Sequence, residues 1–317
     1  MGWTGKIRVD GATFQWMGEN GAADGIATVT DIQITPTRTI FTMQAGPMNL
    51  TVTFLSPVEP SDWVKQSLSF SYLSLEAHAT DGASHSVQVY SDVTGGVQII
   101  ATCVRFIDQS LEWLSGNRAM PMQGSSQTTS GTIYHEFALQ KPQPNVEIDH
   151  QALDVTGYYA MSLQQGLSWQ ITGANDARAQ FATQGSLTSS ASAASGIPVF
   201  SPNCSDLAFA LAVDLGQVQS TTSPVTWAVG LVRDPTVVYT TVSDVLQKRR
   251  PYYVTQYAEI SSAIEAFMED TSSASNRALA LDKKIMDDAA NVSPHYVAGR
   301  RTKLQSSAIQ AAPPTLS

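Results

Sequence analysis

An alternation of apolar and polar side chains in residues 34–92 constrains the fold of this chain more than any other feature. Apolar residues alternate with Thr, Gln and Ser in residues 39–43, 49–55 and 67–75, and breaks containing Pro, Gly or Asp separate these runs. Successive side chains of a strand point to opposite faces, so this alternation is typical of strands with one buried face. The stretch therefore predicts consecutive antiparallel strands.

The run 49–55 also predicts a register. Leu50, Val52 and Phe54 should point into the core, which leaves Asn49 exposed on the opposite face. Asn49 begins an Asn-Leu-Thr acceptor sequence for N-glycosylation, and such a site has to be accessible. The chain contains three acceptor sequences, at Asn49, Asn203 and Asn291. Together with the abundance of Ser and Thr, they favour a secreted, extracellular glycoprotein.

Short strands are expected on both sides of the central stretch, and the absence of a helical period between them favours an antiparallel sandwich over βαβ units. Residues 123–131 are predicted to form a polar surface loop, and residues 185–196 a flexible segment of small residues. Residues 207–215 and 225–232 are almost continuously apolar, as in strands buried on both faces. The remaining predicted strands are residues 6–9, 13–17, 27–34, 133–139, 158–163, 168–172 and 179–183.

The period of the pattern changes after residue 235. Apolar residues then recur at helical spacing in two stripes, which are Tyr257, Ile260, Ile264 and Phe267, and then Ala278, Leu281, Ile285 and Ala289. Ser273 or Ser275 is the expected cap of the second helix, because a serine side chain can accept a hydrogen bond from a free N–H of the first turn. The sequence thus predicts a mainly β protein, an antiparallel β-sandwich followed by a short α-helical hairpin.

Several motifs carry a resemblance to a known family. They are TPTRT, QAGPM, FLSPVEPSDWVKQS, SYLSLEA and DGASHSVQVYSD, all within residues 34–92 or next to them. Together they resemble the amino-terminal β-domain of the fungal glutaminase A family. The resemblance extends over residues 1–298 with interruptions.

The resemblance implies a division of the chain and an activity. Residues 1–240 correspond to the β-sandwich domain and residues 241–298 to the first helices of a six-hairpin helical domain, while residues 299–317 form a disordered tail. The family activity is hydrolysis of the side-chain amide of L-glutamine to glutamate and ammonia outside the cell. We expect the chain to be a fragment that is inactive by itself, with its signal peptide and most of its helical barrel missing.

Residues 96–111 interrupt the family pattern. Their apolar run VQIIATCVRFI lies where the pattern would pass almost directly from Asp92 to Glu112. One interpretation is an extra strand in a tolerant loop. We prefer a second interpretation, an insertion that the family core does not accommodate, such as a retained intron translated in frame. Either way, a β-prone edge invites aggregation.

Catalytic motifs are scarce. The sequence has no nucleophile elbow, no S-x-x-K, no H-E-x-x-H, no C-x-x-C and no phosphate-binding glycine loop, and it implies no cofactor. Asp92 and Glu112 are the remaining candidates, because removal of the intervening segment would bring them close in the chain as a general acid and base. The simpler interpretation is that both are solvated carboxylates at strand or loop ends.

His78 and His85 flank Asp81 and Gly82, which suggests a hairpin. A two-residue turn would place the histidines opposite each other as a pair of metal ligands. A three-residue turn with Gly82 in the left-handed conformation would send them to opposite faces. His135 and Glu136 lack the second histidine that a helical zinc site requires.

The three-residue turn should be preferred because it pairs Leu73 with Val89 and Leu75 with Val87. Burial of these four side chains is worth roughly 1.5–3 kcal/mol each. A one-residue change of register would turn them toward solvent. We therefore expect no metal site.

Composition excludes two classes of partner. The net charge is −9 and only 14% of residues are charged, so the chain presents no basic face to nucleic acid or to an acidic membrane. No apolar run approaches the ~18 residues of a membrane span. The two cysteines, Cys103 and Cys204, do not make a disulfide framework.

Two other functions are open. Carbohydrate enzymes share the plan of a sandwich with a helical barrel, so a six-hairpin glycoside hydrolase or a carbohydrate-binding protein is an alternative to a glutamine-binding hydrolase. Trp16, Trp63 and Trp113 could form a platform on which sugars stack, although aromatic residues of a sandwich usually belong to the core. A non-catalytic structural module is the third function.

Overall fold

The computed structural model describes residues 2–18, 23–94, 122–139, 154–188 and 207–292, together with Pro142, Pro144, Glu147–Ile148 and Gln151–Ala152. Residues 96–111, Glu112, Trp113, both cysteines, Asn203, and the tail 299–317 lie outside this part, as does most of the segment 185–196. The predictions made for them are therefore not tested by the structure.

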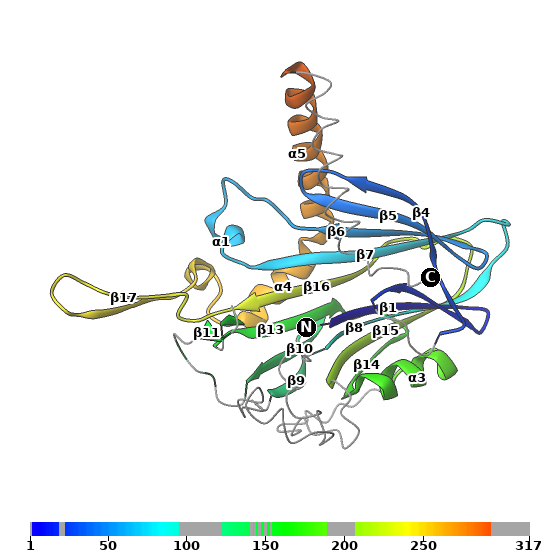
Figure 1. Cartoon of the computed structure of the whole chain (residues 1–317), viewed down its shortest axis with the longest axis horizontal. Coiled ribbons are helices and arrows are strands. Elements are labelled where there is room, and N and C mark those ends of the chain that lie inside the picture. Colours follow the sequence, from blue (N-terminus) through cyan, green and yellow to red (C-terminus); the bar gives the residue numbers. More distant parts are fainter. Residues whose placement is uncertain are drawn as a thin grey trace, which may run out of the picture.

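The described residues form two large sheets packed face to face (Figure 1), which confirms the mainly β, sandwich-type prediction. The first sheet has the order β14-β15-β8-β1-β2-β3, and the second has the order β4-β5-β6-β7-β16-β13-β10-β9. Neighbouring strands are antiparallel apart from the short β2–β3 pair.

The strands of the first sheet are β1 (Gly2–Val9), β2 (Ala12–Met17), β3 (Gly25–Ile26), β8 (His85–Thr94), β14 (Leu167–Gly173) and β15 (Leu207–Val218). Those of the second are β4 (Thr28–Ile34), β5 (Arg38–Ala45), β6 (Met48–Leu55), β7 (Phe70–Ala79), β9 (Met122–Thr128), β10 (Thr132–Leu139), β13 (Thr156–Ser162) and β16 (Val225–Val232). Two small hairpins complete the strands, β11 (Glu147–Ile148) with β12 (Gln151–Ala152), and β17 (Val237–Thr240) with β18 (Leu246–Arg249).

The predicted register of β6 is confirmed. Leu50 and Val52 are fully buried, Phe54 packs against the core, and Asn49 is exposed. Residues 207–213 of β15 are all buried, as their apolar run predicted. In β16 the pattern is mixed, because Leu231 is exposed near the end of the strand.

Both registers predicted for a hairpin between β7 and β8 are wrong. β7 pairs with β6 and β16, whereas β8 pairs with β1 and β15, so the intervening residues 80–84 cross from one sheet to the other. Gly82 does adopt a left-handed conformation, with φ of 77°. The four apolar side chains of the expected pairs, Leu73, Leu75, Val87 and Val89, are still buried in one core. They face the interior from opposite sheets, which satisfies the same apolar pattern as lateral pairing.

Residues 179–183 are not a strand but belong to helix α3 (Ala174–Gln184). The helix ends at Gly185 in the left-handed conformation that closes many helices. Ala174, Ala177 and Phe181 are spaced as on one helical face and are buried against the first sheet. The alanines of this segment favour the helix, and the short apparent alternation gave the wrong period.

Residues 123–128 are also not a loop, because they belong to strand β9 at the edge of the second sheet. Their side chains are almost all polar, so no buried face marks the strand in the sequence. Backbone pairing with β10 holds the strand instead. Gly124 is required where it stands, since a Cβ there would come within 2.3 Å of the Phe209 ring.

Two helices follow the sandwich, as predicted: α4 (Ile260–Glu269) and α5 (Thr271–Val292). Ser273 and Ser275 lie inside α5, so neither is its cap. The buried face of α4 contains Ile264, Phe267 and Met268 and packs on the outer face of the second sheet. The carboxyl-terminal part of α5 projects away from the sheets (Figure 1).

Two short helices lie near this contact, α1 (Trp63–Gln66) and η3 (Tyr252–Thr255). The Asp62 side chain caps α1 by accepting a hydrogen bond from the Lys65 backbone N–H at 3.0 Å. None of the described helices is long and apolar enough to span a membrane.

Candidate functional site

Asp92 lies on β8 beneath helix α3 and is fully buried. Its carboxylate accepts hydrogen bonds from Arg178 Nε at 2.8 Å, from Arg178 Nη2 at 2.9 Å and from the Tyr90 hydroxyl at 2.7 Å. Burial would lower the pKa of Arg178, but the hydrogen bonds with Asp92, the charge of that carboxylate and the interactions with Tyr90 together raise it. The pair is a buried bidentate ion pair that fastens α3 to the first sheet.

Lys6 is also fully buried near this pair. Burial, followed by the repulsion of Arg178, lowers the pKa of Lys6 to about 8, although the charge of Asp92 acts in the opposite direction. Burial also raises the pKa of the Tyr90 hydroxyl, and Asp92 adds to the effect. Asp92 is thus shielded from solvent and held by Arg178.

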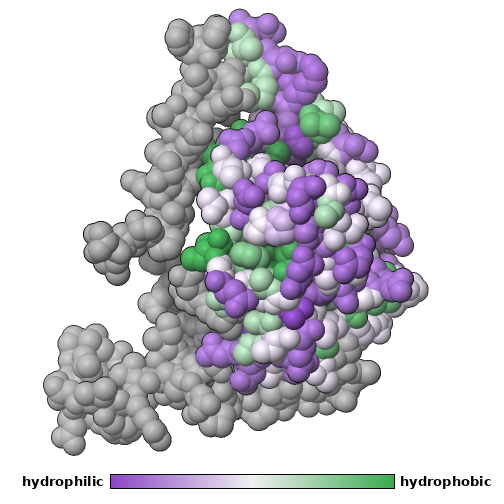
Figure 2. All heavy atoms as spheres, turned by 90° about the vertical axis from the view of Figure 1, so that its right-hand side faces the viewer, coloured by the Kyte–Doolittle hydropathy of each residue, from purple (hydrophilic) through white to green (hydrophobic). Residues whose placement is uncertain are grey.

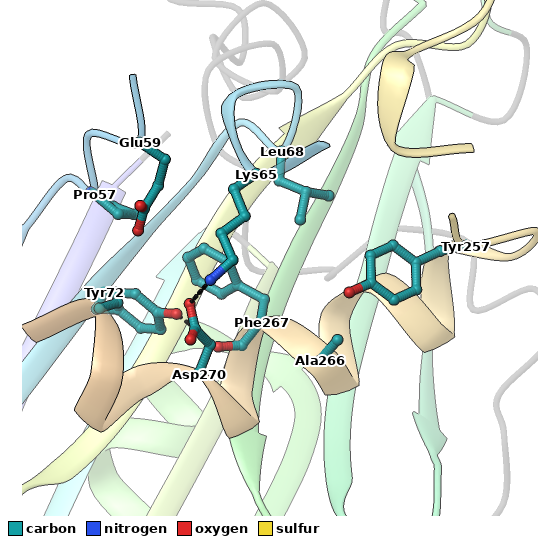
Figure 3. A pocket seen from close by; sticks show the side chains of 10 residues that line it. Pro57, Glu59, Lys65, Leu68, Tyr72, Tyr257, Ala266, Phe267 and Asp270 are labelled. Atoms are coloured by element: carbon teal, nitrogen blue, oxygen red, sulfur yellow. Dashed lines mark hydrogen bonds and ion pairs between the residues drawn. The ribbon is translucent and has the colours of Figure 1, made fainter. Parts of the chain in front are cut away.

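A cleft lies between α1, the loop before it, and helices α4 and α5 (Figure 3). The Tyr72 ring stacks on Phe267 with centroids 4.1 Å apart, and the Tyr72 hydroxyl donates to the Phe267 carbonyl at 2.6 Å. Burial raises the pKa of Tyr72, so this hydroxyl stays protonated. The lining residues are Pro57, Glu59, Lys65, Leu68, Tyr72, Tyr257, Ala266, Phe267, Asp270 and Ala274.

Four charged side chains join the walls of this cleft. Lys65 Nζ lies 2.7 Å from Asp270 Oδ2, and the Arg277 guanidinium donates both to Asp270 at 2.6 Å and to Glu59 at 2.6 Å. Burial would raise the pKa of Asp270, but hydrogen bonds from Arg277 and Lys65 outweigh burial and lower it. Two cations and two carboxylates therefore balance one another.

This charged network holds the loop of Glu59 against the start of α5. The lowered pKa of Asp270 does not suit a general acid near neutral pH. The sequence search missed the network. Charged residues are rare in this chain, at 14%, so each of them is a candidate for a specific contact. This signal could have pointed to Glu59, Lys65, Asp270 and Arg277.

His135 is buried, and both of its ring nitrogens are engaged. Nε2 lies 3.0 Å from the Ala210 carbonyl and therefore donates to it, so Nδ1 accepts from Ser126 Oγ at 2.9 Å. Burial lowers the pKa of His135 to about 4, partly offset by the Ala210 contact, so the ring is neutral. Within the described ranges, no group of three or more His, Cys, Asp or Glu side chains could hold a metal ion.

Trp16 and Trp63, the two of the three tryptophans that the structure describes, do not form one platform. Trp16 is buried and packs on Trp227, with ring centroids 6.2 Å apart. Trp63 is 66% exposed and lies edge to face with Tyr252, which is 47% exposed, at a centroid distance of 5.7 Å. The core interpretation is thus confirmed for Trp16 and wrong for Trp63.

The described sites share one property, which is that their charged groups are already paired. Asp92, the one of the two predicted carboxylates that the structure describes, is an anchor. Asn49 is exposed on β6, and Asn291 is exposed in the last turn of α5.

Comparison with known proteins agrees with the resemblance found in the motifs. The chain is 32% identical over 292 residues to Glutaminase A of Aspergillus oryzae (strain ATCC 42149 / RIB 40). The match covers 91% of this chain but 39% of that protein, so the chain spans well under half the length of its relative. Residues 37–288 match the model of a family described as a domain of unknown function, DUF5127. The chain is therefore a member of the DUF5127 family and is related to glutaminase A.

Proposed function

We propose that this chain is the β-sandwich module of a secreted glutaminase A-type hydrolase, which converts the side-chain amide of L-glutamine to glutamate and ammonia. The observation that carries the proposal is the match to glutaminase A along 91% of this chain. In this proposal the hydrolysis itself takes place in the part of such an enzyme that this chain does not match. The chain by itself is then inactive toward glutamine.

The ion pairs support a structural role for this chain, with hydrolysis in another part of the enzyme. Catalysis requires groups that are preorganised around a concave, water-excluding site and are free to act on a substrate. Asp92 is held by Arg178 under α3, and Glu59 and Asp270 share Arg277. Such groups stabilise a fold, and an enzyme would have to break an ion pair to use any of them.

The module would contribute a rigid support. Helix α4 shares one continuous apolar cluster with the outer face of the second sheet, so the first helices are held by the sandwich itself. The exposed rings of Trp63 and Tyr252 lie beside this contact, and the hairpin of β17 and β18 extends from the body (Figure 1) with Val242 and Leu246 exposed. We assign these surfaces to contacts with the remainder of a longer hydrolase chain.

Secretion and glycosylation belong to the same proposal. Asn49, the first residue of its acceptor sequence, is exposed, and Asn291 is exposed as well. We propose an extracellular protein with glycans at Asn49, Asn203 and Asn291, with glutamine as its small-molecule partner and with no nucleic-acid or membrane partner. The domain boundary at residue 240 and the inserted status of residues 96–111 stay predictions.

Carbohydrate binding is the second candidate function, and the exposure of Trp63 favours it. Exposed aromatic rings offer apolar faces on which sugar rings can stack. Tyr252 covers Trp63 edge to face, so a second ring is already part of the surface. A Trp63→Ala variant that loses retention on a polysaccharide column would support this function.

An exchange of modules tests the first proposal. Residues 1–292 of this chain would replace the matching part of the Aspergillus oryzae enzyme, and ammonia release from glutamine would be compared with reducing-sugar release from a polysaccharide panel. A chimera that folds and releases ammonia supports the proposal. A folded chimera that releases reducing sugar but no ammonia contradicts it and favours the carbohydrate alternative.

A further inference from the structure

His85 joins two turns that belong to different parts of the sandwich. His85 is the first residue of β8, directly after the crossing of residues 80–84 from the second sheet to the first. Its Nδ1 lies 2.6 Å from Oδ2 of Asp10, in the turn between β1 and β2. Its Nε2 lies 3.1 Å and 3.2 Å from the two oxygens of Asp81, in the crossing.

Both turns lie at the right-hand end of the molecule in Figure 1. This end faces the viewer in Figure 2, which shows mainly hydrophilic side chains there around smaller hydrophobic patches. The side chains of Asp10 and Asp81 are 53% and 49% exposed, whereas that of His85 is 11% exposed. Protons can therefore reach the cluster from solvent although the ring is mostly covered.

The number of protons on the ring decides which contacts can form. A neutral imidazole carries one N–H, so it can donate to only one carboxylate, while the imidazolium carries two. His85 faces a carboxylate at each nitrogen, and a carboxylate can only accept. The observed arrangement is thus complete only when His85 is protonated.

The carboxylates are held in place independently of His85. The Ser86 backbone N–H donates to Asp10 Oδ1 at 2.9 Å, and Asp10 itself has a left-handed φ of 50°. The Ala83 backbone N–H donates to Asp81 Oδ1 at 2.9 Å. Both acceptors are therefore in position before the ring is protonated, and loss of the proton leaves them facing a ring that lacks one donor.

We propose that His85, Asp10 and Asp81 form a proton-operated clasp that ties the crossing between the two sheets to the β1–β2 turn in acid and releases the crossing when His85 loses its proton. The shorter contact is to Asp10, so the remaining N–H of the neutral ring stays on Nδ1. The contact that opens is then the one between Nε2 and Asp81. This inference is independent of the enzymatic role of the chain.

The direction of the pH response follows from the contacts. The hydrogen bond to Asp10, and then that to Asp81, raises the pKa of His85 above 6.5, and these two carboxylates are the described charged groups that act on the ring. The stabilisation is therefore complete below the unfolded value near 6.5 and is lost as the pH rises through the folded pKa.

The two carboxylates set the lower limit of the pH range in which the clasp is closed. His85 and Ser86 lower the pKa of Asp10, and Ala83 and His85 lower that of Asp81, in both cases below 3.8. Their contributions are present above that value and are lost as the pH falls through the folded pKa values. The clasp is closed between these limits.

Two measurements on the purified chain test the clasp. The first is the titration midpoint of the His85 ring by NMR. The second is hydrogen exchange of residues 80–84 between about pH 5 and about pH 8, corrected for the intrinsic pH dependence of exchange, a range that spans the ordinary pKa of histidine. We expect a midpoint above 6.5 and a fall in protection through that midpoint.

Conservative variants separate the clasp from ordinary packing. Asp81→Asn keeps an oxygen for the Ala83 N–H, and Asp10→Asn suits the left-handed conformation of that residue, but each removes one charge that favours the imidazolium. Each should lower the His85 midpoint, and Asp81→Asn should abolish the pH dependence of exchange in residues 80–84. His78→Gln, an exposed histidine at the end of β7, is the matched control and should behave as the unmodified chain.

Three outcomes would overturn the clasp. The first is a His85 midpoint at or below 6.5. The second is protection of residues 80–84 that does not change across the midpoint. The third is a loss of the pH dependence of exchange in His78→Gln as large as the loss in Asp81→Asn. A His85→Gln variant removes the ring itself and could fail to fold. Asp10→Asn and Asp81→Asn keep the backbone contacts, so they test the clasp in either case.

Discussion

The Arg178 guanidinium donates two hydrogen bonds to the Asp92 carboxylate, from Nε at 2.8 Å and from Nη2 at 2.9 Å, and thereby joins helix α3 to the centre of the first sheet. The contact spans 86 residues of sequence. It makes Asp92, one of the two candidate catalytic carboxylates in the sequence, an anchor. A buried carboxylate of this kind is expected to govern stability rather than turnover.

Arg178→Ala should destabilise the chain by about 3 kcal/mol, because it leaves Asp92 buried without its counter-charge. Urea unfolding at neutral pH measures the change. Lys283→Ala is the control, since Lys283 belongs to an exposed pair with Asp287 and should leave the stability nearly unchanged. Equal stability of Arg178→Ala and the unmodified chain would contradict the anchor.

Phe267→Ala should cost about 3–5 kcal/mol, because the ring is buried between α4 and the second sheet and stacks on Tyr72. The measurement is the shift of the unfolding midpoint. Leu279→Ala on α5 removes an exposed apolar side chain and should have little effect. Similar losses for both variants would show that α4 is not held by this contact.

A strand such as β6 could be predicted because one of its faces is buried, and Leu50, Val52 and Phe54 alternate with polar residues along it. The pattern could not say which strands are neighbours. Four apolar side chains of β7 and β8 are buried equally well by lateral pairing or across the sandwich, and the structure has the second arrangement. Strand β9 was missed because its polar side chains record no buried face.

The charged sites were harder to predict than the strands. Arg178 is the partner of Asp92, but the residues directly after it, 179–183, were predicted as a strand, so the direction of Arg178 toward the first sheet could not be inferred. The cleft joins Glu59 to Arg277 across 218 residues. Long-range pairs of this kind depend on the packing of complete elements, which local patterns do not contain.

Asp282→Asn should cost about 2–3 kcal/mol at neutral pH, because hydrogen bonds to a charged acceptor are lost. The Asp282 carboxylate on α5 accepts from Thr37 N–H at 2.9 Å, from Thr37 Oγ1 at 2.8 Å, from Thr35 Oγ1 at 2.6 Å and from Arg38 Nε at 2.8 Å. Asp288→Asn, in an exposed pair with Lys284, is the control.

The same carboxylate predicts a pH dependence. Burial would raise the pKa of Asp282, but the hydrogen bonds from Thr35, Thr37 and Arg38 outweigh burial and lower it below 3.8. Its contribution is thus present above the unfolded value and is lost as the pH falls through the folded pKa. In Asp282→Asn the free energy of unfolding should fall less steeply with decreasing pH than in the unmodified chain. Urea unfolding between about pH 5 and about pH 2 measures this slope. An unchanged slope would show that Asp282 does not titrate as proposed.

Asn49→Gln should remove one glycan from the secreted protein without changing its melting temperature, because Asn49 is exposed on β6. Mass spectrometry before and after treatment with an N-glycosidase measures the occupancy. Thr51→Ala destroys the same acceptor sequence by a different change and should give the same mass. An unmodified Asn49 in the protein secreted by a eukaryotic host would contradict the proposed glycan.

Ammonia release from L-glutamine by the purified and folded 317-residue chain tests the central claim most directly, with the Aspergillus oryzae relative assayed in parallel as a positive control. The claim is that the described sandwich supports a hydrolase but contains no reaction centre. It predicts a rate equal to that of buffer alone, while circular dichroism confirms a folded, β-rich protein. Sustained turnover of glutamine by this chain, lost in a folded Asp92→Asn variant, would contradict the claim and place the active site in the sandwich.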